Sequence, residues 1–62
     1  MAELVIRWVN DEAVDILLDG DELISVNHDE HGWDGMQVAL DLSRTFARKL
    51  GADVRVEGDP NL

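Results

Sequence analysis

Two histidines three residues apart, His28 and His31, are the side chains in this chain best suited to chemistry. Asp29 and Glu30 lie between them, and Asp34 follows. Imidazole and carboxylate groups are ligands for zinc and other divalent metals. The spacing differs from the His-Glu-x-x-His motif of zinc proteases, because Glu30 does not follow the first histidine. The segment is also predicted to be a loop, which holds ligands less rigidly, so we expect solvated side chains and no metal or other cofactor.

No other group of residues predicts a catalytic or calcium site. Asp19-Gly20-Asp21-Glu22 resembles the start of an EF-hand loop, but Leu23 and Ile24 follow where a ligand and a glycine belong. The chain has no cysteine nucleophile and no glycine-rich phosphate loop. General acid–base catalysis needs carboxylates in a concave, partly desolvated site, for which 62 residues leave little room. We therefore expect a protein that is not an enzyme.

Charge asymmetry is the most distinctive property of the sequence. Four of the five basic residues lie between Arg44 and Arg55, and the formal net charge is -9. A surface this anionic repels nucleic acid and membranes, and it attracts basic partners. The segment from position 11 to position 34 contains nine carboxylates and no lysine or arginine: Asp11, Glu12, Asp15, Asp19, Asp21, Glu22, Asp29, Glu30 and Asp34.

Length and composition predict one globular domain over residues 1–62. A chain this short buries only about 60% of its unfolded surface, and there is no cysteine to cross-link it. Marginal stability or self-association is expected. No apolar run approaches the roughly 20 residues of a membrane span, and the N-terminus lacks the basic and apolar regions of a signal peptide. A cytoplasmic location is expected.

The elements that position these residues follow from hydrophobic patterning. Strands are predicted at 4–9, 14–18, 23–27 and 53–57, with loops at 10–13 and 28–32 and a polar tail from Gly58. Asp19-Gly20-Asp21 is predicted to form a three-residue hairpin loop. That register places one apolar set on a single face and leaves another set on the opposite face. The first set is Val14, Ile16, Ile24 and Val26, and the second is Asp15 and Ser25 beside Leu17 and Leu23.

One helix is predicted at 35–50. Asp34 fits its N-cap, and Gln37 three residues later has the spacing of a capping box. Gly51 fits a left-handed C-cap. The expected fold is α+β with the order β-β-β-α-β. A three- to four-stranded, mainly antiparallel sheet has the helix packed on one face, and the last strand is free to pair parallel with an earlier one.

On strands, carboxylates two residues apart are about 6.6 Å apart, comparable with neighbouring phosphates on one nucleic-acid strand. In size, charge and this carboxylate row, the chain resembles the small acidic nucleic-acid-mimic inhibitors of phages, of the anti-CRISPR and anti-restriction type. No shared sequence motif supports the resemblance, which implies a mode of action only. The candidate partner-binding residues are Asp11, Glu12, Asp15, Asp19, Asp21, Glu22, Asp29 and Glu30.

That resemblance implies a non-catalytic inhibitor acting in a host cytoplasm. Its partner is then a basic nucleic-acid-binding protein or nucleoprotein complex, with no direct binding to nucleic acid or to membranes, and the chain is a monomer or a weak homodimer. The alternative is a small homodimeric regulatory or assembly domain with an acidic, solvent-adapted surface. Its predicted apolar contact residues are Trp8, Leu17, Leu23, Val38 and Leu42.

Overall fold

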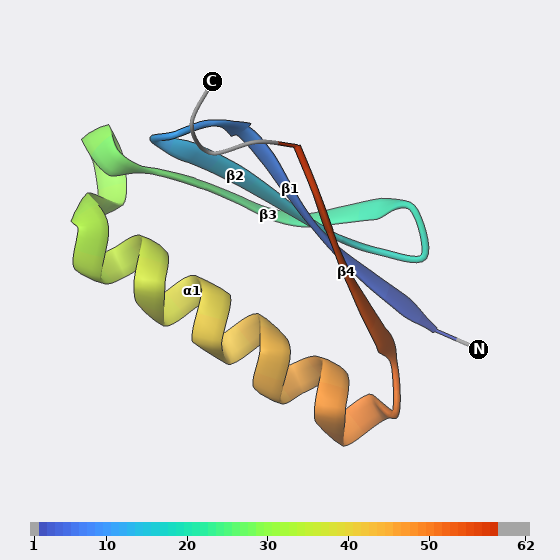
Figure 1. The fold of residues 1–62 in the computed structure, drawn as a ribbon. Coiled ribbons are helices and arrows are strands. Elements are labelled where there is room, and N and C mark those ends of the chain that lie inside the picture. The colour runs from blue at the N-terminus through green and yellow to red at the C-terminus, as the bar shows by residue number, and fades with distance from the viewer. Residues whose placement is uncertain (1, 59–62) are drawn as a thin grey trace.

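Four strands and one helix follow one another in the order β-β-β-α-β (Figure 1). The computed structural model describes residues 2–58, so the predicted polar tail lies outside the described residues except for Gly58. The α+β class and the element order predicted from the sequence are confirmed. The elements are β1 (Glu3–Asn10), β2 (Ala13–Leu18), β3 (Asp21–Asn27), α1 (His28–Leu50) and β4 (Asp53–Glu57).

The strands form one mixed sheet in the order β3-β2-β1-β4. β2 pairs antiparallel with both β1 and β3, whereas β4 pairs parallel with β1. A parallel pair needs a long crossover connection, and α1 supplies it by crossing one face of the sheet from the end of β3 to the start of β4 (Figure 1). Within residues 2–58, no helix is both long enough and apolar enough to cross a membrane.

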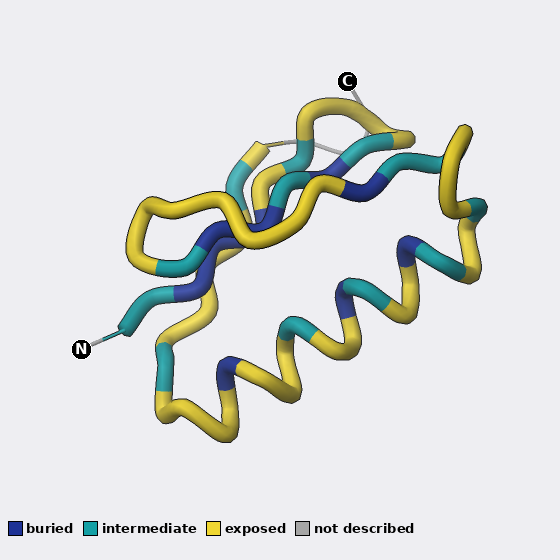
Figure 2. Tube along the Cα trace, turned by 180° about the vertical axis from the view of Figure 1, so that it is seen from behind, coloured by how far each residue is buried: buried dark blue, intermediate teal, exposed yellow. Residues whose placement is uncertain are grey.

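The core lies between that face of the sheet and α1. Alternating residues of the three N-terminal strands point to it, and Ile16 faces Ile6 on one side and Ile24 on the other. Figure 2 shows the buried positions concentrated on the central strands and on one side of the helix. Val14 faces Val26, so the predicted apolar face of the hairpin is confirmed. The buried cluster consists of Leu4, Ile6, Val14, Ile16, Val26, Met36, Leu40 and Ala47.

The β2–β3 hairpin differs from its prediction in loop length. Only Asp19 and Gly20 form the turn, both with positive φ (51° and 89°), as a two-residue type I′ turn requires. The register then shifts, because Ile16 faces Ile24 while Leu17 faces Glu22. Leu23 is therefore the extra residue of a β-bulge. It lies beside α1 rather than beside Leu17 on the open face, where the sequence had placed it.

The start of the helix also differs from its prediction. α1 begins at His28 and not at position 35, and Asn27 is the N-cap, whose side chain accepts a hydrogen bond from the Glu30 backbone N–H at 2.8 Å. Gly32 (φ 70°, ψ 171°) interrupts the helix, so the predicted loop at 28–32 is instead one helical turn and a kink. The predicted capping box is wrong, since the Gln37 amide donates to Asp41. The predicted left-handed cap at Gly51 is confirmed (φ 70°).

Candidate functional site

The whole net charge of the protein resides in one part of the fold. Residues 11–34 contain nine acids and no lysine or arginine, and the other five acids and five bases of the chain cancel. This segment forms β2, β3, their turns and the first part of α1. Since β3 is an edge strand and β2 is its neighbour, the negative charge occupies the half of the sheet away from β4.

The eight candidate carboxylates fall into two clusters. The β1–β2 turn meets the start of α1, where the His28 backbone N–H donates to the Glu12 carbonyl at 2.8 Å. Asp11, Glu12, Asp29 and Glu30 therefore lie at one end of the hairpin, as the helix-start cluster, and Asp19, Asp21 and Glu22 lie at the other, as the hairpin cluster. The six residues of β2 separate them by roughly 20 Å at about 3.3 Å per residue. The predicted single row is thus divided, with Asp15 between its two parts.

Ion pairing distinguishes these carboxylates from Glu3 of β1 and Glu57 of β4. Arg55 bridges Glu3 (3.6 Å) and Glu57 (3.1 Å), and Arg7 contacts Glu57 at 3.3 Å. In the described part of the chain, none of the eight candidates forms an ion pair with an arginine or lysine. Seven are exposed and Asp15 is half-buried. Their charges are therefore left unneutralised by the fold.

Folding accounts for some of these acids. The Asp19 carboxylate accepts a hydrogen bond from the Glu3 backbone N–H at 2.8 Å, and Asp15 accepts one from the Ser25 hydroxyl at 2.7 Å. Asp29 and Glu30 lie in the first helical turn, where negative charge complements the helix dipole. The other four side chains form no hydrogen bond or ion pair within residues 2–58, and they are Asp11, Glu12, Asp21 and Glu22.

The structural role of Asp19 is separable from its charge. Asp19→Ala is expected to lower the free energy of unfolding by about 1 kcal/mol, because the Glu3 N–H loses its acceptor. Asp19→Asn keeps an acceptor oxygen and tolerates the positive φ, so we expect a change below about 0.5 kcal/mol. Urea denaturation of both variants measures the difference. Equal losses would assign the stabilisation to the charge rather than to the hydrogen bond.

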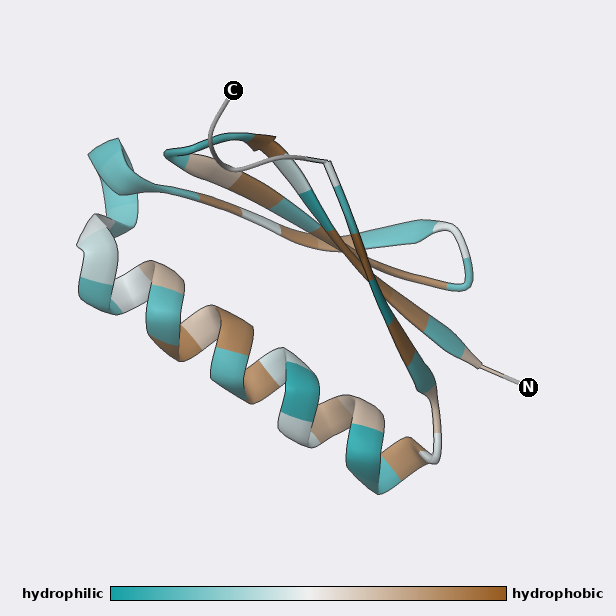
Figure 3. Cartoon of the chain, viewed as in Figure 1, coloured by the Kyte–Doolittle hydropathy of each residue, from teal (hydrophilic) through white to brown (hydrophobic). Residues whose placement is uncertain are grey.

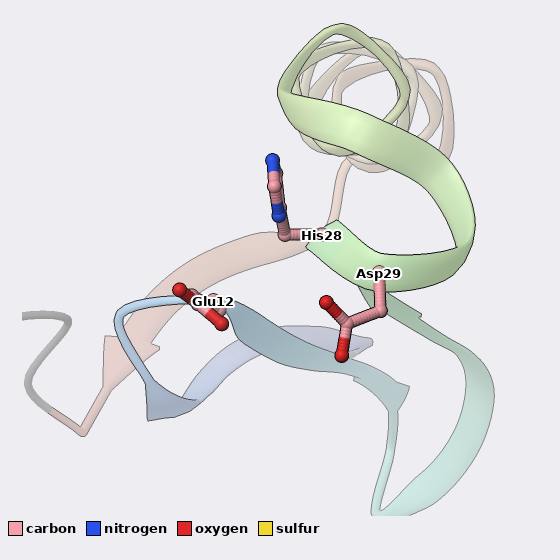
Figure 4. Close-up of side chains that lie close together, drawn as sticks. All are labelled: Glu12, His28 and Asp29. Carbon is pink, nitrogen blue, oxygen red and sulfur yellow. The ribbon is translucent and has the colours of Figure 1, made fainter.

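The two histidines have different neighbours. His31 Nδ1 lies 3.2 Å from the backbone nitrogen of Asn27 and 3.3 Å from its backbone carbonyl oxygen. His28 stacks on Trp33 with ring centroids 4.1 Å apart, and its ring lies beside Glu12 and Asp29, with ligand atoms within 4.8 Å of one another (Figure 4). Sequence reasoning could not find Glu12 in this group, because the β1–β2 turn brings it there. Exposed acidic groups often lie close together without binding a metal ion. We therefore treat Glu12 and Asp29 as members of the helix-start cluster and not as metal ligands.

The apolar contact surface predicted for the alternative function is partly wrong. Leu17 is only 8% exposed because it faces Val5 on the open side of the sheet. Trp8 is half-buried against the core. Leu23, Val38 and Leu42 are exposed as predicted. Leu23 and Leu42 line a groove of about 430 Å³ between β3 and α1. Its other apolar lining residues, which the prediction missed, are Leu4, Ile16, Ile24 and Phe46.

Comparison of the chain with protein-family models, with curated proteins and with solved structures found no match. Its class is therefore defined by the fold and the surface alone. It is an α+β domain with a four-stranded sheet, one covering helix, and a net negative charge carried by β2, β3, their turns and the start of α1.

Proposed function

We propose that this chain is a non-catalytic binding protein whose acidic surface mimics nucleic acid and blocks a basic nucleic-acid-binding site, in the manner of anti-CRISPR and anti-restriction inhibitors. The observation that supports this function is the set of eight carboxylates without ion-pair partners in the described chain, beside a β1–β4 half in which Arg7 and Arg55 pair with Glu3 and Glu57. Within residues 2–58 the fold supplies no lysine or arginine to these eight side chains, and we infer that a partner supplies the cations.

The spacing of the two clusters defines the groove that they fit. Charges within one cluster act together, because the Debye length is about 8 Å at physiological ionic strength. The clusters themselves, roughly 20 Å apart, are screened from each other and form two separate contacts. At about 3.4 Å per base pair, this distance spans roughly six base pairs of duplex. The partner's basic groove is therefore expected to present cations at two points separated by that length.

Steric and electrostatic occlusion is sufficient for the inhibition. Complementary charge accelerates encounter and excludes wrong partners, while the body of the domain covers the groove. Nucleic acid itself is not a partner, because its phosphates are repelled by the same surface. Binding is expected to weaken as salt is added, since exposed ion pairs are screened.

Charge reversal with a charge-matched control at other positions tests the proposal. Glu12→Lys with Glu22→Lys changes one residue in each cluster, and neither side chain forms a hydrogen bond within residues 2–58. Asp41→Lys with Asp53→Lys makes the same change in net charge on α1 and β4. Exposed ion pairs contribute roughly 0.2–1 kcal/mol each, and reversal adds repulsion to their loss. We expect at least about tenfold weaker inhibition for the first variant and little change for the second.

The measurement is binding of labelled DNA by a panel of purified CRISPR effector complexes and restriction endonucleases, with and without this protein. Fluorescence anisotropy at low and at physiological salt reports the loss of DNA binding. Equal effects of the two double variants would show that overall charge, and not the candidate surface, is responsible. Undiminished DNA binding across the panel would exclude these target classes.

A further inference from the structure

α1 carries an apolar stripe that winds from the side facing away from the core towards the groove between α1 and β3. Val38, Leu42 and Phe46 follow at intervals of four residues, so they lie one above another along the helix. Their exposed fractions are 64%, 67% and 44%, whereas Met36, Leu40 and Ala47 are buried against the sheet. Figure 3 shows apolar residues interspersed with polar ones along α1 after its hydrophilic first turns. The stripe borders the groove in which Leu23 and Ile24 of β3 are exposed.

The charges beside this stripe are ordered along the helix axis. Asp29, Glu30 and Asp34 lie at its start, whereas Arg44, Arg48 and Lys49 lie towards its end. From position 35 to position 50 the helix has three bases and one acid. It is therefore the part of this acidic protein where another copy meets the least repulsion. An antiparallel second helix would place its basic end beside the acidic start of the first.

We propose that α1 docks on α1 of a second copy of this chain, antiparallel about a two-fold axis near Leu42. In that arrangement Val38 packs beside Phe46 of the second copy, and Leu42 packs on its own symmetry mate. Asp34 and Arg48 lie at opposite ends of the stripe, about 21 Å apart at 1.5 Å per residue. Antiparallel docking brings Asp34 of each copy close to Arg48 of the other. Every contact away from the two-fold axis then occurs twice, as an isologous interface requires.

The charges favour this interface over pairing of two copies through the β3 edge of the sheet. β3 is an edge strand with exposed backbone groups, but pairing two copies through it would bring their Asp21 and Glu22 side chains into one sheet, and like charges on paired strands are destabilising. The helical interface leaves the open face of the sheet, on the opposite side from α1, accessible (Figure 1). The dimer does not depend on the proposed inhibition. If both hold, each assembly presents two acidic surfaces.

Sedimentation equilibrium from about 1 μM to about 1 mM covers the affinity range of weak complexes. We expect concentration-dependent dimers of the wild-type protein. Leu42→Lys, at an exposed position that the core does not use, is expected to raise the dissociation constant at least about tenfold. Val9→Lys adds the same charge at a position 58% exposed on β1 and is expected to leave it unchanged. Circular dichroism verifies that both variants are folded.

A charge exchange tests the antiparallel orientation. Asp34→Lys and Arg48→Asp are each expected to weaken the dimer, because each places like charges together in both symmetry-related contacts. The double variant restores opposite charges and is expected to recover most of the wild-type affinity. A double variant weaker than either single one would overturn the orientation. A wild-type protein that is monomeric at about 1 mM would overturn the dimer and assign the stripe to a different partner.

Discussion

Ile6→Ala is expected to lower the free energy of unfolding by about 3 kcal/mol, within the range of roughly 2–5 kcal/mol for such truncations of buried side chains. Ile6 is fully buried in β1, between Ile16 of β2 and Val56 of β4. Because β1 joins the antiparallel and the parallel parts of the sheet, a cavity there affects both. A domain of this length has a total stability of roughly 3–9 kcal/mol at 0.05–0.15 kcal/mol per residue. The variant is thus expected to lose between about a third and all of the stability of the fold.

Val9→Ala provides a control on the same strand. Its side chain is exposed, and surface truncations usually change stability by about 0.5 kcal/mol or less. Urea unfolding of the two variants, followed by the fluorescence of Trp8 and Trp33, measures both changes. Similar midpoints for Ile6→Ala and Val9→Ala would contradict the position of Ile6 in the core.

Elements with strong periodicity were predictable from the sequence. β4 was predicted at its observed bounds, because Val54 and Val56 alternate with charged residues between Ala52 and Gly58. The predicted C-terminus of the helix was also correct, because Gly51 adopts the left-handed cap conformation without the strain that a Cβ would cause. In both cases a local rule and the tertiary structure agree. Element order left a mixed or an antiparallel sheet open, and the structure has the mixed one, in which α1 returns the chain parallel to β1.

The helix start and the hairpin were less predictable because two local rules competed at each. Asn27 and Asp34 are both good N-cap residues, and tertiary contact decides between them: the His28 N–H reaches the Glu12 carbonyl in the β1–β2 turn, which holds the chain at Asn27. The hairpin has an analogous ambiguity, since Asp19-Gly20 satisfies a two-residue turn and leaves Leu23 as a bulge. Neither the start of the helix nor the bulge at Leu23 can be predicted without the contacts that each makes with β2 and the turn before it.

The candidate surface was predictable in its members but not in its arrangement. Counting carboxylates from position 11 to position 34 identified the charged segment. That count could not show that Asp11 and Glu12 meet the helix start, nor that both arginines forming ion pairs lie in β1 and β4. The same limit explains Leu17, which alternation correctly placed on the open face of the sheet and which was predicted to be an exposed contact residue. It is buried because β1 supplies Val5 opposite to it.

Gly58→Ala is expected to cost about 2 kcal/mol or more, the second large effect on stability. Gly58 has φ +78°, a region in which residues with a Cβ are strained by about 1–2 kcal/mol. A Cβ there would also lie 2.2 Å from the Trp8 carbonyl oxygen and 3.1 Å from the Trp8 carbonyl carbon and nitrogen. These are backbone atoms of β1, so relieving the overlap means separating the end of β4 from the sheet.

Gly20→Ala separates the two causes. Gly20 has a similar φ of +89°, but nothing lies within 4 Å of the Cβ that alanine would add. It is expected to show only the conformational cost, about 1 kcal/mol. Urea unfolding of both variants measures the difference, which reports the close approach of Gly58 to Trp8. If Gly58→Ala proved no more destabilising than Gly20→Ala, the end of β4 would contribute nothing to stability, and the sheet would be held by its other three strands and the first residues of β4.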